Sequence, residues 1–149
     1  MIKPLATALL IALSSATLSP VAHAVTAQTV TITLQDSSVD PSSAAMVIKT
    51  DTTHVKTGRV TLEAVNRSKN LVHEVLVVPA PPPRTLLPYD SKSNVLIEKR
   101  IHSLGEISEL KPGAKGKLAL SLKPGTYLLL CNQPGHYKAG MATTLVVDK

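Results

Sequence analysis

Short stretches in which apolar and polar residues alternate are the feature that most constrains the fold of this chain. Residues 29–34, 59–64 and 117–122 each place an apolar side chain at every second position. A period of two gives a strand one buried and one solvated face, whereas an amphipathic helix needs a period near 3.6. No long segment of the sequence carries such a helical stripe. The sequence therefore predicts an all-β protein.

Three further segments extend this pattern. Residues 71–78 are apolar on both faces except at His73 and Glu74, which predicts a central strand that is covered on both sides. Residues 142–147 supply a last apolar strand, and residues 127–131 another. Strands of this length and spacing are typical of a Greek-key β-sandwich or barrel.

A turn motif lies between two of these predicted strands. Lys123-Pro-Gly-Thr126 places Pro and Gly where a type II turn needs a fixed φ and then a positive φ. We therefore expect residues 117–122 and 127–131 to form a hairpin.

A proline-rich segment from Pro79 to Arg100 interrupts the strands. Five of its residues are proline, at positions 79, 81, 82, 83 and 88. Proline lacks the amide donor that a central strand needs, so this segment is predicted to be a loop excursion from the sandwich. It has room for a short helix around residues 93–99.

The N-terminal residues 1–24 have the features of a secretory signal peptide. Lys3 precedes an apolar run at residues 5–13, and Ala22-His23-Ala24 forms a small-residue cleavage site before Val25. A membrane anchor is the alternative, but the run is short for a span. We expect a mature domain of residues 25–149 that is exported to the periplasm.

Composition excludes some classes of partner. The net charge is +6, yet the basic residues form no run, and the chain has no Trp and no Phe on which bases could stack. Nucleic-acid binding is therefore not expected. The mature chain is predicted to be a monomer without a membrane span.

Cys131 is the single cysteine of the chain. An exported protein with one cysteine forms no internal disulfide and carries a thiol into an oxidising compartment. An inert core cysteine is one interpretation. His136 and Met141 follow at equal spacing, however, and thiolate, imidazole and thioether together favour copper over harder ions or structural zinc. His73, inside an apolar strand, is the best candidate for a second imidazole, and His₂Cys with a weak axial Met is the ligand set of blue-copper centres.

This order of residues resembles the cupredoxins, the family of plastocyanin, azurin and auracyanin. The resemblance covers most of the mature chain and depends on Asn66, on His73 with Glu74, on the Lys123 to Tyr127 turn, and on Cys131-x4-His136-x4-Met141. It implies an eight-stranded Greek-key β-sandwich with one type 1 copper ion. His73 and His136 would be equatorial ligands, Cys131 the thiolate and Met141 the long axial ligand. Plastocyanin and azurin usually have Asn where this chain has Glu74.

The resemblance implies a one-electron carrier rather than an enzyme, with transient redox partner proteins and with His136 as the point of electron passage. A periplasmic protein for copper resistance, sequestration or delivery is the alternative, although the chain lacks Met-rich or His-rich tracts. A multicopper enzyme would need more histidines than the five present. A metal-free interaction module would leave the Cys-His-Met spacing unexplained. His54 and His102 are assigned no role.

Overall fold

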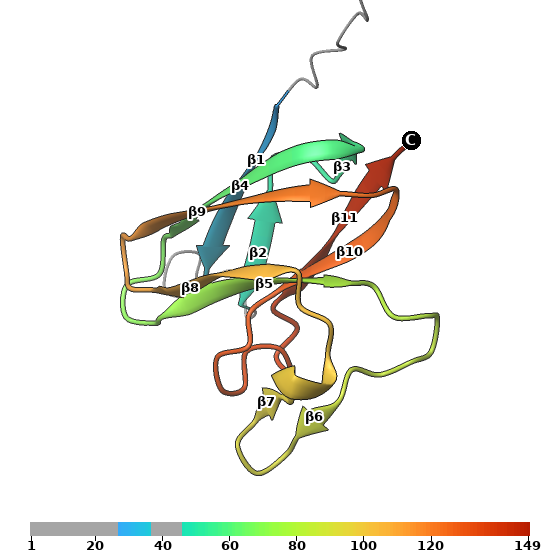
Figure 1. The fold of residues 1–149 in the computed structure, drawn as a ribbon. Helices are drawn as coiled ribbons and strands as arrows, with labels where there is room; N and C mark the ends of the chain where they lie inside the picture. Colours follow the sequence, from blue (N-terminus) through green and yellow to red (C-terminus); the bar gives the residue numbers. More distant parts are fainter. Residues whose placement is uncertain (1–26, 37–45) are drawn as a thin grey trace, which may run out of the picture.

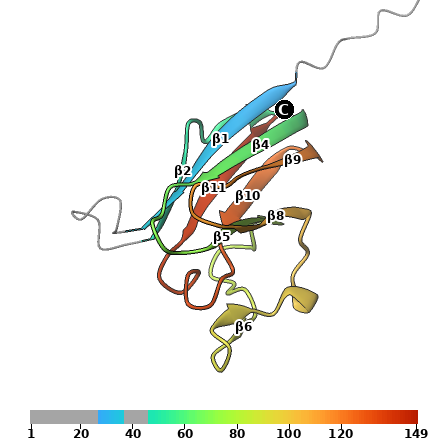
Figure 2. The same ribbon diagram turned by 90° about the vertical axis from the view of Figure 1, so that its left-hand side faces the viewer.

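The computed structural model describes residues 27–36 and 46–149. Two β-sheets packed face to face make up the body of this part of the chain, and a small third sheet lies outside them (Figures 1 and 2). The predicted all-β sandwich is confirmed. One sheet has the strand order β2-β1-β4-β9 and the other has the order β3-β11-β10-β5-β8. The strands of the first sheet are β1 (Gln28–Gln35), β2 (Val47–Thr50), β4 (Gly58–Asn66) and β9 (Lys115–Leu122). Those of the second are β3 (His54–Lys56), β5 (His73–Pro79), β8 (Gly105–Leu110), β10 (Gly125–Leu130) and β11 (Ala142–Asp148).

The core lies between the two sheets and follows the alternation of the sequence. The alternating apolar residues of β1 and β4 are buried, namely Val30, Ile32, Leu34, Val60, Leu62 and Ala64. The threonines between them are half-buried or exposed. Val75 and Val77 of β5 and Leu129 of β10 close the core from the second sheet. Burial of these side chains is the main favourable contribution to folding, because apolar surface is removed from water.

Strand β5 is buried on both faces, as the sequence predicts. Val75 and Val77 face the main core, whereas Leu76 and Val78 belong to a second apolar cluster on the other side of the sheet. Leu96, from the proline-rich segment, is part of that second cluster. A segment outside the sandwich therefore covers the outer face of β5.

The predicted hairpin between residues 117–122 and 127–131 is wrong. Strand β9 pairs with β4 in one sheet, whereas β10 pairs with β5 and β11 in the other. The Lys123 turn is present, closed by a 2.8 Å hydrogen bond from the Tyr127 hydroxyl to the Lys123 carbonyl, but it connects the two sheets. A turn motif fixes only the local reversal of the chain, and the long antiparallel register offered by β4 decides which sheet β9 joins.

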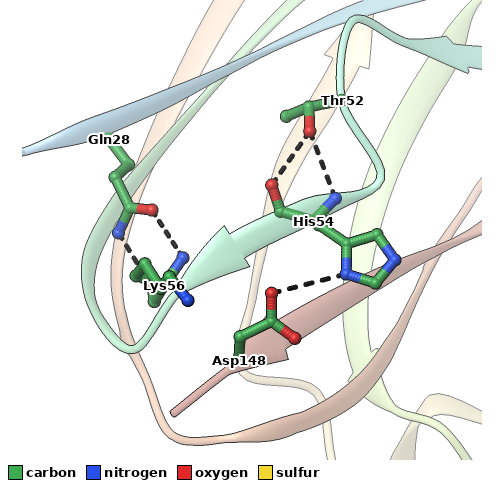
Figure 3. Close-up of polar contacts among 5 residues, drawn as sticks. All are labelled: Gln28, Thr52, His54, Lys56 and Asp148. Atoms are coloured by element: carbon green, nitrogen blue, oxygen red, sulfur yellow. Dashed lines mark hydrogen bonds and ion pairs between the residues drawn. The ribbon is translucent and has the colours of Figure 1, made fainter.

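Short strands at the sheet edges escaped the sequence patterns. Strand β3 has three residues and pairs in parallel with the end of β11. Its backbone is tied to β1 by the Gln28 side chain, which exchanges hydrogen bonds of 2.8 and 2.5 Å with the Lys56 backbone (Figure 3). Strands this short carry too few residues to show a period.

The proline-rich segment leaves the sandwich as predicted, and it is folded. It contains a small two-stranded sheet of β6 (Tyr89–Asp90) and β7 (Val95–Leu96), followed by a single 3₁₀ turn, η1 (Glu98–Arg100). This turn stands in place of the helix around residues 93–99. The segment and the loop between β10 and β11 project from the same end of the sandwich (Figures 1 and 2).

The predicted signal peptide, residues 1–24, lies outside the described residues. Among residues 27–36 and 46–149, no helix has the length and apolar character that a membrane crossing requires.

Candidate metal centre

Three side chains from two distant parts of the sequence meet at one end of the sandwich. His73 is the first residue of β5, Cys131 follows the last residue of β10, and His136 lies in the loop before β11. His73 and Cys131 are fully buried and His136 is 8% exposed. The Cys131 Sγ atom lies 3.3 Å from His136 Nδ1 and 3.9 Å from His73 Nδ1, and the two Nδ1 atoms are 3.2 Å apart. The three donor atoms therefore converge on one point.

Met141 belongs to the same end of the sandwich. It is the residue before β11, is fully buried, and packs in the main core cluster together with Cys131. The Cys131 amide donates to the Met141 carbonyl at 3.1 Å, and the Met141 amide donates to the His136 carbonyl at 3.0 Å. These two backbone hydrogen bonds hold Met141 beside both residues.

The loop from residue 131 to 141 is made of tight turns. Gly135 and Gly140 have φ values of +83° and +90°, in the region that other residues rarely adopt. Pro134 restricts the backbone before the first of them. The structure thus confirms that the glycines allow the chain to turn sharply beside His136 and Met141.

His73 is held by a polar network behind it. Its Nε2 atom lies 2.7 Å from the Ser68 hydroxyl, and the Ser68 amide donates to the Asn66 side chain at 2.9 Å. Asn66 in turn donates to the Leu71 and Leu110 carbonyls at 2.8 and 2.7 Å. A partner on Nε2 fixes the ring so that Nδ1 faces the cluster, as outer hydrogen bonds do for metal-bound histidines.

Glu74 links the start of β5 to the loop after Cys131 through its carboxylate, at the position where plastocyanin and azurin usually have Asn. Its carboxylate accepts a 2.9 Å hydrogen bond from the Asn132 backbone amide and a 3.2 Å hydrogen bond from the Gln133 side chain. Its backbone amide hydrogen-bonds to the Cys131 sulfur, as does that of Gln133, and both bonds oppose the effect of burial on the thiol pKa. Burial raises the pKa of Glu74 itself.

Burial also sets the protonation of the three donors. It lowers the pKa of His73 to about 4, with a further contribution from the neighbouring His136. Burial likewise lowers the pKa of His136. The thiol of Cys131 has its pKa raised to about 11 by the same cause. At neutral pH both imidazoles are therefore neutral and carry lone pairs, and the thiol retains its proton unless a cation displaces it.

This donor set fits a soft or borderline metal ion. The ligand atoms of His73, Cys131 and His136 all lie within 4.8 Å of one another, as a shared ion requires. Two imidazole nitrogens in direct contact share at most one proton between them, so a cation at this point satisfies both. Hard ions such as Mg²⁺ and Ca²⁺ prefer oxygen ligands, which this cluster does not provide.

The sequence-predicted residues His73, Cys131, His136 and Met141 are brought together, while His54 lies in β3 at the far end of β11. Sequence reasoning missed two supporting residues, Ser68 and Asn132. Ser68 lies in a short polar segment between strands, and Asn132 directly follows the cysteine. A buried polar residue beside a ligand is the signal that points to such roles.

Comparison with solved structures finds proteins of the same architecture. Auracyanin from Roseiflexus castenholzii is 22% identical with a TM-score of 0.53, and the match covers 80% of this chain and 97% of that one. Rusticyanin from Thiobacillus ferrooxidans is 19% identical with a TM-score of 0.55, covering 81% and 78%. Auracyanin A from Chloroflexus aurantiacus, a "blue" copper protein, is 23% identical with a TM-score of 0.52, covering 80% and 99%.

No protein-family model matches the sequence, and no curated protein matches it either. At these identities the structural likeness shows the fold of the chain. The fold shared with the auracyanins and rusticyanin is the β-sandwich.

Proposed function

We propose that this chain, which has the cupredoxin fold, is an exported type 1 copper protein that carries single electrons between partner proteins. His73, Cys131 and His136 would hold the ion, with Met141 as a further, weaker ligand. Residues 1–24 would direct export to the periplasm. The observation that carries the proposal is the convergence of two buried imidazoles and one buried thiol.

The protein's part in such a reaction is to hold its ligands still. A bound copper ion supplies one-electron chemistry by changing between Cu(I) and Cu(II). The backbone bonds between Cys131, His136 and Met141 and the contact from Ser68 to His73 limit the movement of the ligands during that change. A site that moves little needs little reorganisation when an electron arrives or leaves.

His136 offers the path for the electron. Of the three converging residues it alone retains exposed surface, 8%, while His73 and Cys131 have none. A partner that docks over this residue would approach the ion through one imidazole ring. Such redox contacts are small, which permits rapid release after transfer.

The first test is a titration of the purified protein, residues 25–149, with Cu(II), followed in the visible spectrum. We expect an intense thiolate-to-copper band that saturates at one equivalent and bleaches reversibly with ascorbate. Cys131→Ala should lack the band. His54→Ala changes an exposed histidine in β3, beside the C-terminal end of β11, and should keep the band unchanged.

Four results would contradict parts of the proposal. Binding without the band, or equal binding by Cys131→Ala, would exclude type 1 copper. A band that forms but is not reduced by ascorbate would favour copper storage or delivery over electron transfer. A separate expression of the full chain, with fractionation of the cells, tests export: retention of uncleaved chain in the cytoplasm would exclude it.

A further inference from the structure

The proline-rich excursion returns to contact the metal-binding loop directly. We call residues 89–100 the strap; it contains β6, β7 and η1. The Gly135 amide donates to the Asn94 carbonyl at 2.7 Å. The Asn132 side chain hydrogen-bonds to the Leu96 backbone and to the Glu98 side chain. Asn132 directly follows Cys131, and Gly135 directly precedes His136. The strap is therefore hydrogen-bonded to the loop beside two of the proposed ligands.

Asn132 uses every polar group of its side chain in this contact. Its Oδ1 atom accepts from the Leu96 amide at 2.6 Å. Its Nδ2 atom donates to the Leu96 carbonyl at 3.2 Å and to Glu98 Oε1 at 2.8 Å. Asn132 is 5% exposed and Leu96 is 1% exposed, so most of these bonds are shielded from water. An aspartate could not replace it, because it lacks both donor hydrogens.

These hydrogen bonds, rather than close packing, hold the strap at this point. A pocket of about 480 Å³ opens beside them, lined from the strap by Leu96 and Glu98 and from the other side by Glu74, Asn132 and Gln133. Where a gap lies between two segments, dispersion contacts across it are lost. The strap is anchored elsewhere, by Leu96 in the second apolar cluster on β5 and β10.

We propose that the strap is a positioning device for the metal centre and that Asn132 is its positioning residue. This inference rests on the proposed function. Asn132 and Gln133 share one peptide group, whose N–H is the Gln133 amide that hydrogen-bonds to the Cys131 sulfur. Fixing the Asn132 side chain therefore fixes the direction of that N–H. Hydrogen bonds to a coordinating sulfur withdraw electron density from it and raise the reduction potential of the metal.

The first measurement needs no copper and so is independent of the proposed function. Amide hydrogen exchange of the metal-free protein reports whether the strap is attached. Asn132→Ala should exchange at Leu96 and Gly135 roughly a hundredfold faster, because three side-chain bonds are lost, with the amides of β1 and β4 unchanged. Glu98→Ala, which removes one partly buried hydrogen bond, should give roughly a fivefold increase in exchange at Leu96.

The second measurement is made on the copper-loaded protein. Asn132→Ala should shift the one-electron equilibrium toward the oxidised form by about tenfold, which is about 59 mV of lower potential, and should move the thiolate-to-copper band. Glu98→Gln keeps an acceptor oxygen and should retain the wild-type exchange at Leu96 and the band. Lys99→Gln, an exposed change of one charge in the same turn, controls for charge alone.

Unchanged exchange at Leu96 and Gly135 in both Asn132→Ala and Glu98→Ala would show that these hydrogen bonds do not attach the strap to the loop. Faster exchange with an unchanged potential and band would overturn its positioning role. If Asn132→Ala fails to fold, Glu98→Ala on the exposed side of the contact carries the test, and its exchange and potential decide. If the wild-type protein never forms the band, the proposed function fails, whereas the exchange result still reports on the strap.

Discussion

The two ends of strand β11 place histidines in opposite surroundings. At the N-terminal end of β11 lie Met141 and the buried pair His73 and His136, whose ring centroids are 4.9 Å apart. At its other end His54 lies 3.4 Å from Asp148, with side chains 60% and 43% exposed (Figure 3). The Thr52 side-chain hydroxyl donates to the His54 carbonyl at 2.9 Å and accepts from the His54 backbone amide at 3.2 Å (Figure 3).

The difference shows what turns a histidine into a candidate ligand. An exposed imidazole keeps its water and gains little from one carboxylate, since solvent screens the attraction. A buried imidazole that faces other donors has lost its water, and its ring nitrogen needs a partner at the point where the donor atoms converge. Convergence and burial, and not the presence of histidine, mark the candidate metal centre.

The largest expected effect separates the two ends by metal affinity. His136→Ala should weaken copper binding by more than about 100-fold, because even the loss of a group that only supports a ligand costs 10–100-fold. His54→Ala should change it less than about twofold. Competition with a chelator of known affinity measures both. An equal loss of copper affinity in the two variants would contradict the conclusion that only the buried end of β11 binds the metal.

Acid should destabilise the metal-free protein through the buried end. The pKa of His73 is about 4 in the folded protein against 6.5 ordinarily, so between these values the unfolded chain binds more protons. The unfolding free energy should therefore fall by about 3 kcal/mol as the pH drops from 6.5 to 4. Urea denaturation across this range measures it. His54→Ala should keep the loss, and a His73→Ala variant that keeps it in full would contradict the assignment.

A smaller effect is expected at the group that supports His73. Ser68→Ala removes the hydroxyl 2.7 Å from Nε2, which leaves a buried ring nitrogen without its partner. We expect about 1 kcal/mol lower stability and about tenfold weaker copper binding. Ser108→Ala, whose hydroxyl hydrogen-bonds to the exposed Glu106, is the matched control for stability. Copper affinity equal to that of the wild type would show that Ser68 does not orient the ring.

The smallest effect is expected at the exposed end. Asp148→Asn removes the carboxylate charge beside His54 and should change stability by less than about 0.5 kcal/mol, because exposed ion pairs contribute little. Thermal unfolding at low and high salt measures it. A loss above about 1 kcal/mol would mean that this pair is stronger than its exposure implies.

The sequence by itself determined the parts that depend on local pattern. The alternation in residues 29–34, 59–64 and 117–122 predicted three strands of the sandwich, because a period of two has one physical meaning wherever it occurs. The spacing of Cys131, His136 and Met141 is likewise local, since one loop carries all three. His73 was found because a polar residue interrupts the apolar run of residues 71–78; in the structure it is the first residue of β5.

Only the tertiary structure decided which segments meet. The Lys123 turn reads as a hairpin, yet its two strands lie in different sheets, because pairing is chosen by partners far along the chain. The bulge opposite Glu74, between His73 and Val75, has no local signature either. Likewise Ser68 behind His73, and the strap held by Asn132, join residues whose neighbours in sequence say nothing of each other. Burial and hydrogen bonding depend on the whole packed chain, and a pattern read along one segment does not contain that information.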